Sequence, residues 1–204
     1  MRLAVLIACL AIAVAAVAGT HSPPAKASCG GVVHYYSKKR HLPYRPPLAI
    51  GDSVMLGAVP QLTRVGYEVD TRGCRMWNEG LDVLRSRQRA HTLPHLVVMA
   101  LGANWSITKK DVWQALTVVG KHRVLGIVTP RELGGGSGSD AVTVRTMGAK
   151  YPTRIVVMDW VRYSAGHSGW FYSDGLHLTP SGAVAYGHLF RSVFRYAKPS
   201  TKLS

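Results

Sequence analysis

The chain has 204 residues, 47% of them hydrophobic, and a formal net charge of +15 at pH 7. This length favours one domain with a substantial apolar core, and no segment beyond the N-terminus is apolar enough to span a bilayer, which argues against an integral membrane domain. The charge favours a polyanionic partner, but the arginines are scattered and no nucleic-acid-binding module is recognisable. We therefore predict no nucleic-acid partner. Anionic envelope polymers, lipid head groups and a basic surface without a specific partner remain as alternatives.

The N-terminus has the features of a secretory signal peptide. A basic residue precedes an unbroken apolar run over residues 3–18, and the Ala-Lys-Ala tripeptide at 25–27 is a small-x-small cleavage site. We expect residues 1–27 to be removed as a signal peptide, with Ala18 as a second candidate cleavage position. An uncleaved anchor is the alternative, although the run is short for a bilayer span. Cleavage would lower the charge by two, from +15 to about +13, and the protein would be secreted or held in the cell envelope.

Two cysteines remain once the predicted signal peptide is removed. Cys9 lies within the signal, which leaves Cys29 and Cys74 in an exported chain. Exported proteins form structural disulfides because their compartments are oxidising. We therefore predict a disulfide between Cys29 and Cys74, with two unpaired thiols as the alternative.

In chain order, an extended basic lead-in is followed by alternating strands and helices. Residues 28–47 are polar, basic and proline-containing, whereas the domain itself is expected over residues 48–197, with a short tail at 198–204. Apolar runs predict strands at residues 48–50, 67–71, 95–101, 123–128 and 154–158. Amphipathic stretches predict helices at residues 54–65, 77–89, 108–119, 140–149 and 181–196. Thr108 is the expected N-cap of the third of these helices.

This alternation predicts an α/β fold, a three-layer α/β/α sandwich with a five-stranded parallel sheet. The strands are almost continuously apolar, as expected for a sheet that is covered on both faces. In such sheets ligands bind beyond the carboxyl ends of the strands. Ser53, Gly73, Asn104 and Pro130 each follow a predicted strand, so the fold itself would place them along one edge of the sheet.

Ser53, Asp174 and His177 together supply the groups needed for covalent acyl transfer. Asp174 and His177 are three residues apart, so that one turn can place both side chains on the same side. The Asp174 carboxylate can accept a hydrogen bond from His177 Nδ1–H, which leaves Nε2 free to take the proton of Ser53. Alone, Ser53 is equally suited to be a helix N-cap, and a surface Asp near a His is unremarkable in a chain with nine histidines.

Two further residues at the same predicted edge could stabilise a negatively charged intermediate. The side-chain amide of Asn104 can donate a hydrogen bond to an oxyanion, and the backbone N–H of Gly73 can do the same. A turn asparagine and a turn glycine are the structural alternatives.

Other motifs give weaker signals. Residues 134–139 are Gly-Gly-Gly-Ser-Gly-Ser, which lack the lysine of a phosphate-binding loop and predict a flexible loop at the same edge. His91 and His95 are four residues apart, but Pro94 interrupts the helix that would direct both at one metal ion. We therefore predict no metal site and no cofactor.

These residues resemble the motifs of the SGNH hydrolases, also called GDSL-type esterases and lipases. Four blocks occur in order: Gly51-Asp52-Ser53, Gly73, Gly102-x-Asn104 and Asp174-x-x-His177. The resemblance covers residues 48–197 and implies a flavodoxin-like sandwich. It assigns Ser53 as nucleophile, His177 as base and Asp174 as the group that orients the base. It also implies an oxyanion hole formed by the Ser53 N–H, the Gly73 N–H and the Asn104 side chain.

The resemblance implies an exported, metal-independent serine esterase that hydrolyses acetyl or other short acyl esters through an acyl-serine. The expected substrate is an ester, such as an O-acylated cell-wall glycan or a lipid. Residues 51–58, Gly-Asp-Ser-Val-Met-Leu-Gly-Ala, are also similar to the extracellular domains that O-acetylate peptidoglycan. An O-acyltransferase acting on cell-wall sugars is therefore the first alternative. A non-catalytic module that binds the cell envelope is the second.

Overall fold

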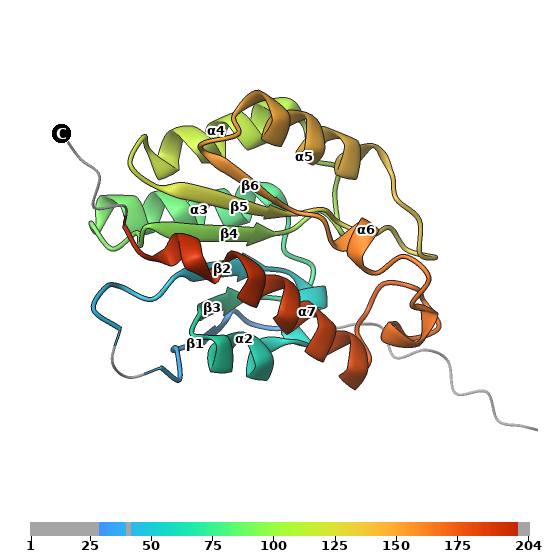
Figure 1. Cartoon of the computed structure of the whole chain (residues 1–204). Coiled ribbons are helices and arrows are strands. Elements are labelled where there is room, and N and C mark those ends of the chain that lie inside the picture. The colour runs from blue at the N-terminus through green and yellow to red at the C-terminus, as the bar shows by residue number, and fades with distance from the viewer. Residues whose placement is uncertain (1–28, 40–41, 200–204) are drawn as a thin grey trace, which may run out of the picture.

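The computed structural model describes residues 29–39 and 42–199, with helices on both faces of one central sheet (Figure 1). The strands are β1 (Val33–Tyr35), β2 (Leu48–Gly51), β3 (Glu68–Thr71), β4 (Leu96–Ala100), β5 (Val124–Val128) and β6 (Ile155–Met158). The helices are α1 (Ser53–Leu56), α2 (Val59–Val65), α3 (Trp77–Arg89), α4 (Lys109–Val119), α5 (Ser139–Lys150), α6 (Trp160–Tyr163) and α7 (Pro180–Val193), with short 3-10 helices η1 (Ser168–Trp170) and η2 (Phe194–Ala197). The predicted signal peptide lies outside the described residues, as does most of the predicted tail.

The strand order in the sheet is β1-β3-β2-β4-β5-β6. The five strands from β2 to β6 are parallel, as predicted, and their order is that of a flavodoxin-like sheet. The prediction of five strands is corrected to six, because Val33–Tyr35 within the lead-in pairs antiparallel with β3 at the edge of the sheet. This three-residue strand is mostly exposed, so its sequence carries no buried apolar run that would indicate it.

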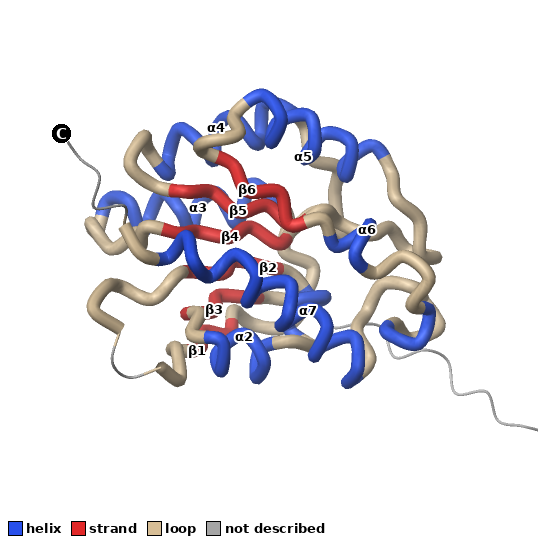
Figure 2. The backbone as a smooth tube through the Cα atoms, viewed as in Figure 1, coloured by secondary structure: helices blue, strands red, loops and turns tan. Residues whose placement is uncertain are grey.

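Alternate residues of each strand face opposite helical layers. Leu48 and Ile50 of β2 belong to a core shared with α3, α4 and α5, whereas Ala49 belongs to a second core shared with α2 and α7. Figure 2 shows the strands between these two helical layers. The predicted three-layer α/β/α sandwich is thus confirmed, because both faces of the sheet are covered.

The helix predictions hold with local corrections. The helix predicted at 54–65 is divided into α1 and α2, and Pro60 lies in the first turn of α2, where its missing N–H does no harm. Thr108 caps α4, accepting a hydrogen bond from the N–H of Asp111 at 3.2 Å. The final helix ends at Val193, and its last turn tightens into η2. Helices α6 and η1 have no counterpart in the prediction because each is a single turn.

The predicted disulfide is present. Cys29 and Cys74 are bonded, with their Cα atoms 5.1 Å apart, and the bond ties the chain ahead of β1 to the loop that follows β3. The neighbouring Gly73 lies so close to this segment that an added Cβ would sit 2.9 Å from the Cys29 carbonyl oxygen. A glycine at position 73 therefore allows the two backbone segments to approach.

Across residues 29–39 and 42–199, none of the helices combines the length and the hydropathy that crossing a bilayer requires.

Candidate active site

Ser53 lies two residues beyond the end of β2, beside the point where the strand order reverses between β2 and β4. Asp52, and not Ser53, caps the short helix α1, since Asp52 Oδ1 accepts the N–H of Val54 at 3.0 Å. The carbonyl oxygen of Asp52 is held in turn by the Thr71 hydroxyl at 2.8 Å. The N-cap explanation of Ser53 is therefore excluded, and its hydroxyl is free to bond elsewhere.

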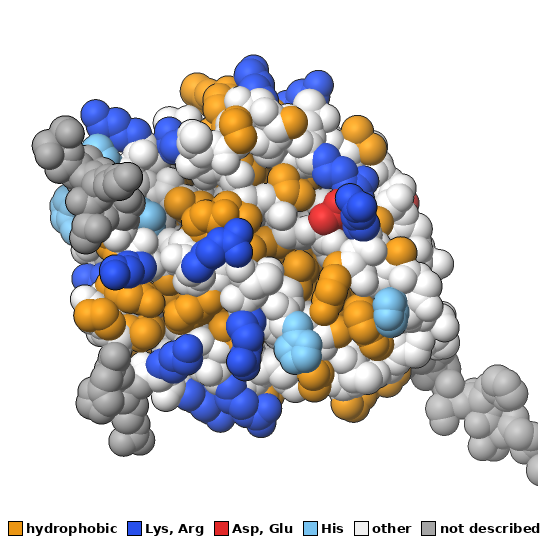
Figure 3. Space-filling view, in the orientation of Figure 1, with side chains coloured by type: hydrophobic (Ala, Val, Ile, Leu, Met, Phe, Trp, Pro, Cys, Tyr) orange, Lys and Arg blue, Asp and Glu red, His pale blue; other side chains and the backbone are white. Residues whose placement is uncertain are grey.

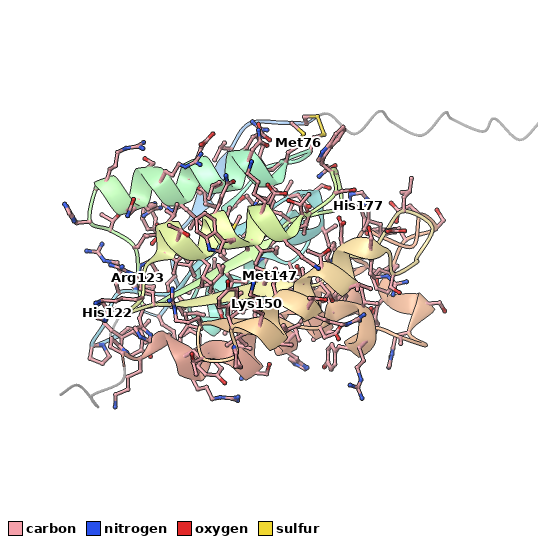
Figure 4. The ribbon with its side chains drawn as sticks, turned by 90° about the horizontal axis from the view of Figure 1, so that it is seen from above. Met76, His122, Arg123, Met147, Lys150 and His177 are labelled. Carbon is pink, nitrogen blue, oxygen red and sulfur yellow. A yellow bond between two sulfur atoms is a disulfide. The ribbon has the colours of Figure 1, made fainter. Side chains whose placement is uncertain are left out.

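The structure brings Ser53, His177 and Asp174 into one hydrogen-bonded chain. His177 Nε2 lies 2.9 Å from Ser53 Oγ, and His177 Nδ1 lies 2.6 Å from Asp174 Oδ2. A proton on Nδ1 satisfies both contacts: the ring donates to the carboxylate and accepts from the hydroxyl. Figure 4 shows His177 toward one end of the sheet, with His122 and Arg123 at the other.

The loop that carries His177 is ordered by its own aspartate. Asp174 Oδ1 accepts the backbone N–H groups of Leu176 and His177, each at 2.9 Å. One carboxylate oxygen therefore holds the turn while the other holds the imidazole ring. Gly175 adopts a φ of +68°, which side-chain-bearing residues rarely adopt, and so closes the turn.

A second loop supports this turn from outside. The Gly134 N–H donates to the Asp174 carbonyl at 2.8 Å, and Arg131 Nε donates to the Gly175 carbonyl at 3.2 Å. Arg131 also donates to the Gly135 carbonyl and to Ser164 Oγ, and its guanidinium stacks on the Phe171 ring. The segment predicted as a flexible loop is thus bonded to the turn that carries His177.

Two carboxyl groups near Ser53 have opposite electrostatic environments. Partial burial alone would raise the pKa of Asp174, but hydrogen bonds from the His177 ring and from the backbone N–H groups of Leu176 and His177 together hold that pKa below its usual range. Complete burial raises the pKa of Asp52 to about 6, against the opposing effect of hydrogen bonds from the Val54 and Ala103 N–H groups and of the His177 charge. Asp174 is therefore the carboxylate suited to stabilise an imidazolium.

A groove of about 420 Å³ opens at Ser53 and His177. It runs between the first turns of α2 and α7. Its lining residues are Ser53, Gly57, Pro60, Gln61, Tyr172, His177, Leu178, Thr179, Pro180 and Ala183. Sequence reasoning did not identify Gln61 or Tyr172, because neither belongs to a motif and both reach the groove only through the packing of α2 and the turn before α7.

The predicted oxyanion-hole residues Gly73 and Asn104 lie on adjacent loops. The Asn104 side-chain amide lies 3.4 Å from the Arg75 carbonyl, which joins the loop after β4 to the loop that contains Gly73. Neither residue lines the groove described above, and the Asn104 side chain is exposed. Their role as oxyanion donors remains a prediction.

Two other residues near the predicted edge of the sheet, Arg75 and Trp105, differ in burial. The Arg75 side chain points into the fold, where it is 2% exposed, pairs with Asp70 at 2.7 Å and lies 3.3 Å from the Gly51 carbonyl. Trp105, which follows Asn104, is 72% exposed. Arg75 therefore fastens β2 to β3, whereas Trp105 is open to solvent.

In the part of the chain that the structure describes, no three His, Cys, Asp or Glu side chains are grouped closely enough to hold a metal ion. His95 Nδ1 lies 2.8 Å from the Tyr196 carbonyl oxygen, so this ring is engaged with the C-terminal turn.

Comparison with known proteins finds sequence similarity to curated O-acetyltransferases. No protein-family model matches the sequence. The chain is 30% identical over 150 residues to the peptidoglycan O-acetyltransferase OatA of Listeria monocytogenes, an alignment that covers 72% of this chain and 23% of that protein. It is 27% identical over 154 residues to the O-acetyltransferase OatA of Staphylococcus aureus, covering 73% and 25% respectively. The chain thus spans about a quarter of the length of these curated relatives.

Solved structures identify the fold. The C-terminal catalytic domain of the Streptococcus pneumoniae peptidoglycan O-acetyltransferase OatA superimposes with a TM-score of 0.66 at 22% identity, covering 76% of this chain and 94% of that domain. A GDSL-like lipase from Bacteroides thetaiotaomicron gives a TM-score of 0.56 at 13% identity, covering 76% and 89%. The chain therefore has the fold of the SGNH/GDSL hydrolases and is similar in sequence to O-acetyltransferases, one of them a peptidoglycan O-acetyltransferase.

Proposed function

We propose that the protein is an exported enzyme that transfers an acyl group through an ester of Ser53. The observation that carries this proposal is the continuous hydrogen-bonded chain from Ser53 through His177 to Asp174 at the edge of a parallel sheet. Export is supported by the signal-like N-terminus and by the Cys29–Cys74 disulfide.

The first half-reaction loads the serine. Ser53 Oγ attacks the carbonyl carbon of a donor ester as its proton passes to His177 Nε2. The Asp174 carboxylate stabilises the imidazolium, and the bond to the leaving oxygen then breaks as His177 returns the proton to that oxygen. The product is an acyl-serine and a free alcohol.

The second half-reaction unloads the serine by the same steps in reverse. An acceptor hydroxyl gives its proton to His177 and attacks the acyl carbon, and Ser53 leaves with the proton that His177 returns. In both halves the charge on the carbonyl oxygen would be held by the backbone N–H groups of Ser53 and Gly73 and by the Asn104 amide. One such donor typically contributes ~3 kcal/mol to transition-state stabilisation.

The acceptor that we propose is a sugar hydroxyl of a cell-wall glycan, with acetyl as the transferred group. The support is the similarity to two O-acetyltransferases, one of them described as acting on peptidoglycan. The motifs alone do not separate water from a sugar as the acceptor, and the GDSL-like lipase among the structural neighbours shares this fold. Hydrolysis of the acyl-serine is therefore the second candidate.

One experiment separates the two acceptors. The purified protein is incubated with p-nitrophenyl acetate, with and without soluble muropeptides, and both acetate release and acetylated muropeptide are measured by mass spectrometry. Acetylated sugar that accumulates in proportion to the muropeptide concentration supports transfer, whereas acetate release unaffected by muropeptide supports hydrolysis. Ser53→Ala should abolish both products, and Ser86→Ala, an exposed serine on α3, is the matched control.

A non-catalytic envelope-binding module predicts a different result. A fluorophosphonate probe should label the protein at Ser53, because the His177 contact makes that hydroxyl nucleophilic. A folded protein that binds wall polymer and yet leaves the probe unreacted would favour the binding module instead.

A further inference from the structure

The face formed by α2 and α7 carries basic side chains and no acidic ones. The chain has 10 acidic residues, and all of them lie between positions 52 and 174, outside α2, α7 and η2. Arg64, His188 and Arg191 line a groove of about 160 Å³ between the two helices. Figure 3 shows Lys, Arg and His side chains over α2 and α7, without Asp or Glu among them.

The positive charge of this groove is not neutralised within the described residues. Among the described residues, the arginines that form ion pairs all lie outside this groove. They are Arg72, Arg75, Arg85, Arg87 and Arg145. Arg64 and Arg191 are exposed and take part in none of the ion pairs. Exposed guanidinium groups without nearby carboxylates attract anions and can bind a carboxylate with two parallel hydrogen bonds.

The basic groove adjoins the groove at Ser53. Gln61 lines both, and its side-chain Oε1 is buried without a hydrogen-bond partner in the described part of the chain. Helix α7 extends along both as well, because Ala183 lines the first groove and Arg191 the second. Eight residues of helix correspond to a rise of about 12 Å, so one extended polymer can contact both grooves at once.

The geometry points to an anionic substrate: peptidoglycan whose peptide carboxylates are bound by Arg64 and Arg191 while an adjacent sugar faces Ser53. This inference rests on the proposed function, because the molecule that Arg64 and Arg191 bind must also present its sugar to Ser53. The joined grooves allow one molecule to do both. A lipid surface fits less well, because Val184 is the only large hydrophobic side chain that α2 and α7 expose, and interfacial binding requires several inserted apolar groups.

The test measures binding, so that it does not depend on catalysis. Ser53→Ala protein is sedimented with peptidoglycan sacculi from which hydrofluoric acid has removed phosphodiester-linked polymers. Adding Arg64→Glu and Arg191→Glu should weaken binding at least about tenfold at low salt, and the difference should shrink in 1 M NaCl as screening takes over. Thermal unfolding of each variant confirms that the fold is retained.

The matched control reverses two charges elsewhere. Arg89→Glu and Lys121→Glu change the net charge by the same amount at exposed positions that form no ion pair within the described residues. Lys121 adjoins His122, at the end of the sheet away from His177 (Figure 4). This control should bind the stripped sacculi as tightly as its parent.

Three results would overturn the inference. An equal loss in both charge-reversal variants would mean that overall charge alone governs binding. Binding that disappears once the sacculi are stripped would assign the face to phosphate polymers, and binding to phosphatidylglycerol vesicles but not to sacculi would assign it to a membrane. Failure of the proposed function is recognised separately, by Ser53→Ala protein that still releases p-nitrophenol from p-nitrophenyl acetate.

Discussion

The backbone N–H of Gly134 donates a hydrogen bond to the carbonyl oxygen of Asp174 at 2.8 Å. The contact joins the glycine-rich loop after β5 to the turn that positions His177. Together with Arg131, which donates to Gly175 and Gly135, it makes the geometry of the proposed base depend on a loop that contributes no chemistry.

Replacing Asp174 with Asn should lower kcat for p-nitrophenyl acetate by about 10⁴-fold. The amide cannot stabilise an imidazolium, and it can hold the ring in the wrong tautomer. Steady-state kinetics measure the change, and Asp82→Asn, an exposed carboxyl on α3, should leave kcat as it is. A loss of less than tenfold in Asp174→Asn would contradict the assigned role.

Arg131→Met should lower kcat by about 10–100-fold with little change in KM, because a small displacement of a catalytic group has effects of this size. Arg131→Lys should restore part of the rate, since a lysine can still reach one of the carbonyl groups. Arg85 on α3 is half-buried and, within the described residues, pairs only with the neighbouring Asp82, and Arg85→Met is the control substitution. A rise in KM with unchanged kcat would show that Arg131 acts on substrate binding instead.

Gly175→Ala tests the contact between the two loops directly. An added Cβ would lie 2.8 Å from the Gly135 nitrogen, and the residue has a φ of +68°. Gly166→Ala is a close control, because its φ is +77° but nothing lies within 4 Å of the added carbon. Both substitutions should lower the free energy of unfolding by about 1 kcal/mol, because alanine is strained at a positive φ. Only Gly175→Ala should lose more stability than this and also have a lower kcat.

Asp52 should make stability fall as the pH rises. Its folded-state pKa is raised to about 6 from 3.8, so the folded protein holds the proton more tightly and loses that advantage as the pH rises through about 6. Between pH 4.5 and pH 7.5, the stability of the wild type relative to Asp52→Asn should drop by about 2 kcal/mol. Urea unfolding at both pH values measures this, and a difference that does not vary with pH would exclude the effect.

The sequence was sufficient to predict the parallel sheet and the meeting of Ser53 with His177. Continuous apolar runs specify buried parallel strands, and the strand-end rule places Ser53 at the edge of the sheet. The contact of Ser53 with His177 was expected instead from the chemistry of the two side chains and from the family resemblance. The disulfide was predictable for a different reason, namely the chemistry of the compartment in which an exported chain folds.

What the sequence could not supply depends on packing. Strand β1 pairs through its backbone and buries little, so its side chains give no periodic signal. The complete burial of Asp52 follows from how α1 and the loop after β4 close over it, and the contacts of Arg131 require several separate segments to converge. Such tertiary relationships have no counterpart in local sequence spacing.

Replacing both Cys29 and Cys74 with Ser should destabilise the protein by about 4 kcal/mol, the loop-closure estimate for a separation of 45 residues. Chemical unfolding with and without reductant measures the difference. A variant as stable as the oxidised wild type would show that the bond is dispensable.

The position of this bond has a consequence for how the polypeptide is delivered. It lies just ahead of the three-residue strand that completes the outer border of the sheet, so in a reduced chain β1 would be held to β3 only by backbone pairing and by the contact of His34 with Glu68. Under the proposed export, oxidation in the receiving compartment would fix β1 at that border and keep the edge of β3 from pairing with other molecules. In an exported chain, the disulfide would thus couple completion of the sheet edge to arrival in an oxidising compartment.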